Sequence, residues 1–208
     1  MNLLSKNIII CLTLSNLNNQ AFFQYKPMMN NRIDQISMSF QVEANPDELI
    51  IRYSVINPTD KDIYLTDVIL NYQNDKPQVN INEISCSWLK SNNLLLISNY
   101  CMPVPEGMLM MNEPSFYVTR IIARSTYSNH ITLKIPVPAA DMPSGLFKTR
   151  TAKGIKLEFG YSFYDESLEL MPAEELDASI FIAGYSFLDL QQILSAEQTD
   201  LSIQCQKM

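Results

Sequence analysis

Residues 155–163 read Ile155-Lys156-Leu157-Glu158-Phe159-Gly160-Tyr161-Ser162-Phe163, with apolar side chains at all five odd positions. The even positions hold Lys, Glu, Gly and Ser, so apolar residues recur with a period of two. Successive side chains of a β-strand point to opposite faces of a sheet. The segment therefore predicts a strand with one buried face, and it indicates a β protein.

The same alternation recurs elsewhere in the chain. It predicts further strands at residues 36–42, 49–56 and 131–137, and apolar runs predict extended structure at 63–70, 115–123 and 179–188. Asn45-Pro46-Asp47 is a turn sequence, so the first two strands are expected to form a hairpin. Shorter apolar runs at 79–90 and 93–98 are typical of a β-meander.

Helical character is confined to residues 188–197, where Asp189 is a candidate N-cap. Many short strands with little helix favour an all-β fold, an antiparallel immunoglobulin-like β-sandwich with a short C-terminal helix. A β-barrel is the alternative. The chain has only five glycines, which favours the sandwich, because closing a small barrel usually needs glycine bends. We expect an irregular N-terminal extension over residues 1–32 and one β-sandwich domain over residues 33–208.

Composition excludes several classes of function. A net charge of -7 argues against nucleic-acid binding, which depends on clustered Lys and Arg. His130 is the single histidine, no G-x-S-x-G elbow is present, and the five glycines are isolated from one another. These features argue against a Ser-His-Asp hydrolase and a phosphate-binding loop, and we expect no cofactor.

The four cysteines, Cys11, Cys86, Cys101 and Cys205, contain no C-x-x-C pair, so we expect buried thiols and no structural metal. A Cys86–Cys101 bridge is the alternative for an exported protein. The apolar run 8–14 is short for a signal peptide, and no stretch approaches the length of a membrane span. We expect a cytoplasmic protein, with a periplasmic or secreted location as the alternative.

Three segments resemble a known group of proteins. Residues 53–65, from Tyr53-Ser54-Val55-Ile56-Asn57-Pro58 to Leu65, and the proline-containing stretches 103–107 and 134–138 are similar to uncharacterised bacterial immunoglobulin-like β-sandwich proteins. The resemblance covers residues 36–164. It implies the sandwich fold and no catalytic residues.

Acidic residues offer two candidate sites. Asp60, Asp62 and Asp67 supply oxygen ligands of the kind that calcium prefers, but their spacing matches no complete loop motif, so a turn with solvated charges is favoured. The connection between two predicted strands is more acidic, and we expect it, or a short helix at 173–177, to bind a basic protein. The candidate partner-binding residues are Asp165, Glu166, Glu169, Glu174, Glu175 and Asp177.

These observations predict a non-enzymatic protein-binding module. The alternatives are an inhibitor or immunity-type protein that blocks a basic partner, and an enzyme with an unrecognised site. A second candidate surface is the loop 101–114, in which Met102, Met108, Met110 and Met111 cluster.

Overall fold

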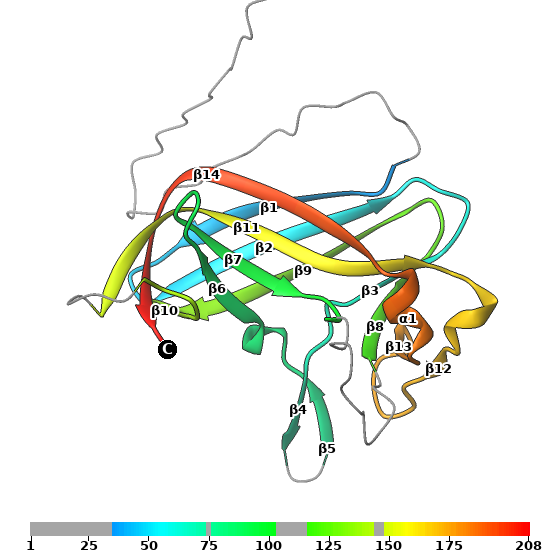
Figure 1. The fold of residues 1–208 in the computed structure, drawn as a ribbon. Helices are drawn as coiled ribbons and strands as arrows, with labels where there is room; N and C mark the ends of the chain where they lie inside the picture. Colours follow the sequence, from blue (N-terminus) through cyan, green and yellow to red (C-terminus); the bar gives the residue numbers. More distant parts are fainter. Residues whose placement is uncertain (1–34, 74–75, 103–115, 144–147) are drawn as a thin grey trace, which may run out of the picture.

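The protein is mostly β. The computed structural model describes residues 35–73, 76–102, 116–143 and 148–208, of which 62% are in strands, with one short α-helix. The predicted β-rich fold is confirmed at this level (Figure 1). The extension predicted over residues 1–32 lies outside the described residues.

Sheet A contains three antiparallel strands in the order β1 (Ser37–Ala44), β2 (Glu48–Asn57) and β9 (Ser125–Lys134). The turn between β1 and β2 is closed by a hydrogen bond from the Asn45 backbone N–H to the Glu48 carbonyl oxygen. One face of β1 and of β2 is buried, as the period of two requires, whereas in β9 the buried residues are Ile131 and Leu133. The predicted hairpin is confirmed.

Sheet B has nine strands around β11 (Thr149–Phe163), which contains the segment that first indicated a β protein. The main path is β10 (Val137–Ala139), β14 (Gln192–Lys207), β11, β3 (Ile63–Leu65), β8 (Phe116–Ile121), β13 (Ile180–Ala183) and β12 (Met171–Pro172). On the same edge of β11 as β3, opposite β14, β7 (Leu94–Asn99) pairs with residues 155–159, and β6 (Ser85–Leu89) pairs with β7. A separate hairpin joins β4 (Leu70–Gln73) to β5 (Lys76–Val79), and a 3-10 turn follows at Ile81–Glu83.

The expectation of purely antiparallel pairing is wrong for sheet B. β11 pairs in parallel with β7, and β10 pairs in parallel with β14. Both pairings join segments that are far apart in the sequence, where local turn signals carry no information about strand direction. Sheet B is therefore a mixed sheet.

The predicted helix at 188–197 is also largely wrong. α1 spans Ser186–Leu190, and the chain then enters β14, the longest strand of the described structure, which pairs antiparallel with β11. The apolar run 179–188 is divided between β13 and α1. The short helix therefore precedes a C-terminal strand.

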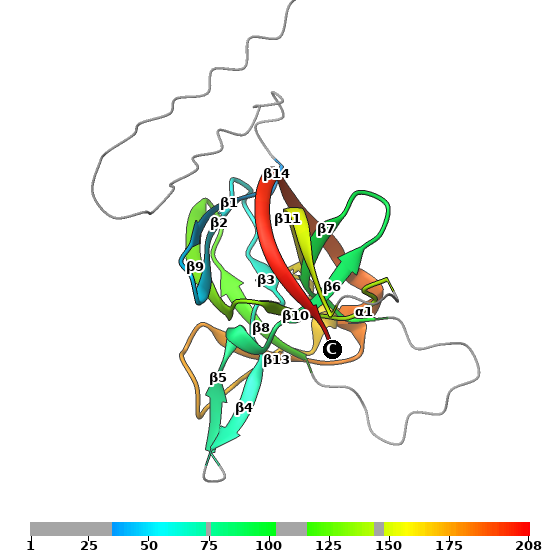
Figure 2. The same ribbon diagram turned by 90° about the vertical axis from the view of Figure 1, so that its left-hand side faces the viewer.

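The main core lies where sheet A faces sheet B (Figure 2). Most of its buried side chains come from β1, β2 and β9 of sheet A and from β6, β7, β11 and β14 of sheet B, and β3, β8 and β10 supply others. The ring of Tyr53 on β2 packs against Phe159 on β11, with centroids 5.1 Å apart. Two smaller clusters, around Phe187 and around Val68, lie beneath α1 and beside β13.

Candidate interaction site

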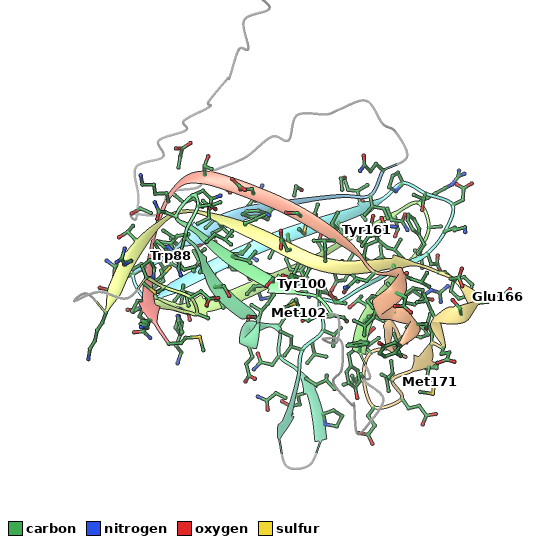
Figure 3. The ribbon with its side chains drawn as sticks, viewed as in Figure 1. Trp88, Tyr100, Met102, Tyr161, Glu166 and Met171 are labelled. Carbon is green, nitrogen blue, oxygen red and sulfur yellow. The ribbon has the colours of Figure 1, made fainter. Side chains whose placement is uncertain are left out.

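The acidic segment, residues 165–177, connects β11 to β13 at one end of the molecule. Figure 3 places Glu166 and Met171 of this segment at the opposite end from Trp88. All six predicted partner-binding side chains are exposed: Asp165, Glu166, Glu169, Glu174, Glu175 and Asp177. All six side chains therefore lie on one exposed connection between strands.

Buried apolar residues anchor the acidic segment to the body of the protein. Leu168 ends a 3-10 turn at Glu166–Leu168 and packs with Phe187 of α1. Ala173 packs with Ile180, and their backbones are joined by a hydrogen bond from the Ala173 N–H to the Ile180 carbonyl. Residues 173–177 form a turn instead of the helix offered as an alternative. The carboxylates therefore project from a fixed backbone.

Two of the six acids also shape the backbone. The carboxylate of Asp165 accepts hydrogen bonds from the backbone N–H and the hydroxyl of Ser167 at 2.9 and 2.6 Å. Asp177 does the same with Ser179 at 2.9 and 2.7 Å. Hydrogen bonding to the serines holds the pKa of both carboxyls below the usual value. Both residues therefore have a structural role as well as a charge.

The remaining four acids, Glu166, Glu169, Glu174 and Glu175, take part in no ion pair with another described residue. The four ion pairs found in the described parts of the chain involve Glu43, Asp60, Asp62 and Glu158 on the acidic side. None of the four glutamates belongs to such a pair. Their charges are therefore available to a partner.

A surface recess of about 460 Å³ adjoins the start of the acidic segment. It is lined by Tyr164, Asp165 and Glu166 together with Asp60, Lys61 and Asp62 of the turn between β2 and β3. The two acidic groups are about a hundred residues apart in the sequence, yet the pairing of β3 with the end of β11 brings them together. Sequence reasoning treated these groups as separate.

Arginines neutralise two of the recess carboxylates. Arg120 lies 2.6 Å from Asp62, and Arg124 lies 2.8 Å from Asp60. The turn is held by Asn57, whose buried side-chain amide donates to the carbonyl oxygen of Lys61 at 2.9 Å. The excess negative charge of this end of the molecule therefore comes from the acidic segment.

The calcium alternative fails on geometry. Asp60 and Asp62 line the recess, whereas Asp67 is 1% exposed and belongs to the interior. Across residues 35–73, 76–102, 116–143 and 148–208, no three His, Cys, Asp or Glu side chains are grouped to hold a metal ion. The three aspartates do not form one site.

Asp67 belongs instead to a buried polar network that sequence reasoning missed. Its carboxyl group accepts hydrogen bonds from the Tyr53 hydroxyl at 2.7 Å and from the Thr119 hydroxyl at 2.5 Å. Tyr127 and Asn129 of β9 also hydrogen-bond within this group. The available signal was an acidic residue inside the apolar run 63–70.

The other chemical candidates do not converge on a site. His130 is exposed in the middle of β9, opposite Arg52, and the buried hydroxyl of Ser186 lies in α1. Cys86, Cys101 and Cys205 are buried free thiols as predicted, and Cys86 and Cys101 lie in different core clusters, so the alternative bridge is wrong. Met102 is 71% exposed, whereas Met108, Met110, Met111 and most of the loop 101–114 lie outside the described residues, as does Cys11.

Comparison with known proteins does not assign the chain to a family. No protein-family model, no curated protein and no solved structure matches the chain. The resemblance to bacterial immunoglobulin-like proteins therefore stays a prediction. Within the described ranges, no helix has the length and apolar character needed to cross a membrane.

Proposed function

We propose that this protein is a non-enzymatic binding module that docks a basic segment of a protein partner on its acidic segment. The observation that carries the proposal is a set of four glutamates that are exposed on an anchored backbone and have no ion-pair partner in the described part of the chain: Glu166, Glu169, Glu174 and Glu175. Exposed charge of one sign steers association with a partner of the opposite sign.

Anchoring matters because a partner then meets carboxylates that are already ordered. Leu168 is fully buried and Ala173 is 8% exposed, so the segment is attached to the core at two points. A binding surface that is fixed beforehand avoids the entropy cost of ordering a loop on association. The anchoring therefore favours a docking role for the segment over the alternative that it is only a solvated connection between strands.

The recess offers a place for one basic side chain of the partner. Tyr164 is 50% exposed there, beside the carboxylates of Asp165 and Glu166. The face of a tyrosine ring attracts a guanidinium or ammonium group, and the carboxylates supply hydrogen-bond acceptors. An Arg or Lys side chain would therefore enter this recess while neighbouring basic residues meet the glutamates.

Affinity capture from the native cells tests the proposal with two matched variants. The acid variant replaces Glu166, Glu169, Glu174 and Glu175 by Gln. The control variant, Asp47→Asn, Glu48→Gln, Glu197→Gln and Asp200→Asn, removes the same number of exposed charges elsewhere. A protein retained by the wild type and the control but not by the acid variant is the expected result, whereas identical captured proteins for all three contradict the proposal.

We also infer that the two facing sheets form an immunoglobulin-like β-sandwich and that the protein acts in the cytoplasm. The shared core between sheet A and sheet B supports the first inference. Buried free thiols at Cys86, Cys101 and Cys205 are in keeping with a reducing compartment. Intact-mass measurement of the native protein tests the location, since loss of the first residues would indicate export.

A further inference from the structure

Asp67 lies at the joint between the two sheets. It follows β3 of sheet B, and its hydrogen-bond partners are Thr119 on β8 of sheet B and Tyr53 on β2 of sheet A. Tyr127 and Asn129 add contacts from β9 of sheet A. One carboxyl group therefore connects four strands across the core.

Two physical effects oppose each other at this carboxyl group. The partners are hydroxyl and amide donors, and the short distances of 2.5 and 2.7 Å suit an ionised carboxylate, which only accepts hydrogen bonds. Complete burial disfavours the charge, and no ion pair of the described structure includes Asp67. Burial is the larger effect, and it raises the pKa of Asp67 above the usual value.

Among the ionisable side chains near Asp67, only Asp67 itself changes its protonation state between acidic and mildly alkaline pH. Tyr53 and Tyr127 are the ionisable side chains that face it from β2 and β9, and burial raises the pKa of both, so they stay neutral. Arg120 follows Thr119 on β8, but it points to the exposed side and pairs with Asp62. His130 follows Asn129 on β9 and is likewise exposed. A change of protonation between acidic and mildly alkaline pH therefore falls on Asp67.

We propose that Asp67 is a pH-sensitive latch, which holds β2 and β9 against β3 and β8 most tightly when it is protonated and loosens this joint when it ionises. Ionisation places a negative charge in an apolar interior, and water must reach it or the neighbouring strands must move. The device is independent of the proposed partner-binding surface.

The sign of the pH effect follows from proton linkage. Between the usual pKa of an aspartate and the raised pKa of Asp67, the folded state binds more protons than the unfolded state. Stability is therefore highest at the acidic end of this interval, falls as the pH rises through it, and stays lower above it. The unfolding constant grows by at most about tenfold per pH unit, the limit for one proton.

Urea unfolding of the wild type and Asp67→Asn, from about pH 4 to about pH 9, measures this effect. We expect the ratio of their unfolding constants, wild type over variant, to increase with pH across the interval. The control Asp177→Asn removes a carboxyl whose pKa is lowered, so its ratio changes only at more acidic pH. A ratio for Asp67→Asn that does not change with pH overturns the proposal.

Measurements on the wild type keep the proposal testable if Asp67→Asn does not fold. The NMR chemical shift of the Asp67 carboxyl carbon is expected to titrate above the ordinary range for aspartate. As Asp67 ionises, we expect the backbone amides of β2, β3, β8 and β9 to lose protection against hydrogen exchange, after correction for the intrinsic exchange rate. The amides that pair β11 with β14 are expected to keep their protection. A carboxyl that titrates in the ordinary range, or protection that falls uniformly, overturns the latch.

Discussion

The hydroxyl of Tyr53 donates a hydrogen bond to Oδ2 of Asp67 at 2.7 Å, and both side chains are buried. The same tyrosine ring packs on Phe159 of β11. Tyr53 lies in sheet A, whereas Phe159 lies in sheet B and Asp67 lies two residues after the end of β3 in that sheet. One residue therefore joins the two halves of the core by a polar and an apolar contact.

Replacing Tyr53 by Phe keeps the ring and removes this hydrogen bond. We expect a loss of about 1–3 kcal/mol of stability, because a buried carboxyl group is left with one partner fewer. Urea unfolding measures the loss. Tyr161→Phe is the control, since its hydroxyl bonds Gln192 at a partly exposed site, and an equal loss in the two variants would contradict the special role of Tyr53.

Gly160 permits a close approach between β11 and the start of β14. A Cβ atom at this position would clash with Oε1 of Gln191. The Gln191 side chain is held in place, because it accepts a hydrogen bond from the Cys101 backbone N–H at 2.8 Å and donates one to the Cys101 carbonyl at 2.9 Å. Gly160→Ala is therefore expected to destabilise the protein by about 1–3 kcal/mol through overpacking. Thermal or urea unfolding detects a change of this size.

A double-mutant cycle identifies the cause. Gln191→Ala removes the clashing side chain, so Gly160→Ala should cost less in that background than in the wild type. The same cost in both backgrounds would show that Gln191 is not the group that requires glycine.

The three described cysteines are expected to be unreactive in the folded protein. Burial raises the pKa of Cys86 and Cys101 to about 12 and that of Cys205 to about 11, so little thiolate exists at about pH 8. In a Cys11→Ser variant, an aromatic disulfide reagent should label these thiols only after unfolding. Rapid labelling of any of them in the native state would contradict the buried positions.

The alternation of apolar and polar residues predicted those strands in which the same face stays buried along the strand. β1, β2 and β11 each have one apolar face over their predicted length, so the sequence was sufficient there. The asparagine-containing turn after β2 was also predictable, because Asn57 bonds the backbone around it. The distant acidic residues of the recess meet only through the pairing of β3 with β11, which no local pattern encodes.

The start of β14 was misread as a helix because Leu190, Ile193 and Leu194 recur at helical spacing, although Leu190 and Ile193 are exposed in the structure. The inward residues of β14 are Leu194 and Gln198 before the irregularity and Ile203 and Cys205 after it. Between them Asp200 adopts a positive φ of 63°, and the pairing with β11 shifts between Ala152 and Gly154. Across this irregularity the buried positions move from even to odd numbers, which conceals the second half of the strand from a test for a period of two.

The association rate with the captured partner, measured against salt concentration, tests the central claim most directly. We expect the acid variant with its four Glu→Gln changes to associate about tenfold or more slowly at low salt, with a weaker salt dependence, because steering by surface charge is lost. The control variant should keep the wild-type rate, and both variants should keep the wild-type melting temperature, since exposed charges contribute little to stability. Equal association rates and equal salt dependences for the wild type, the acid variant and the control would contradict binding through the acidic segment.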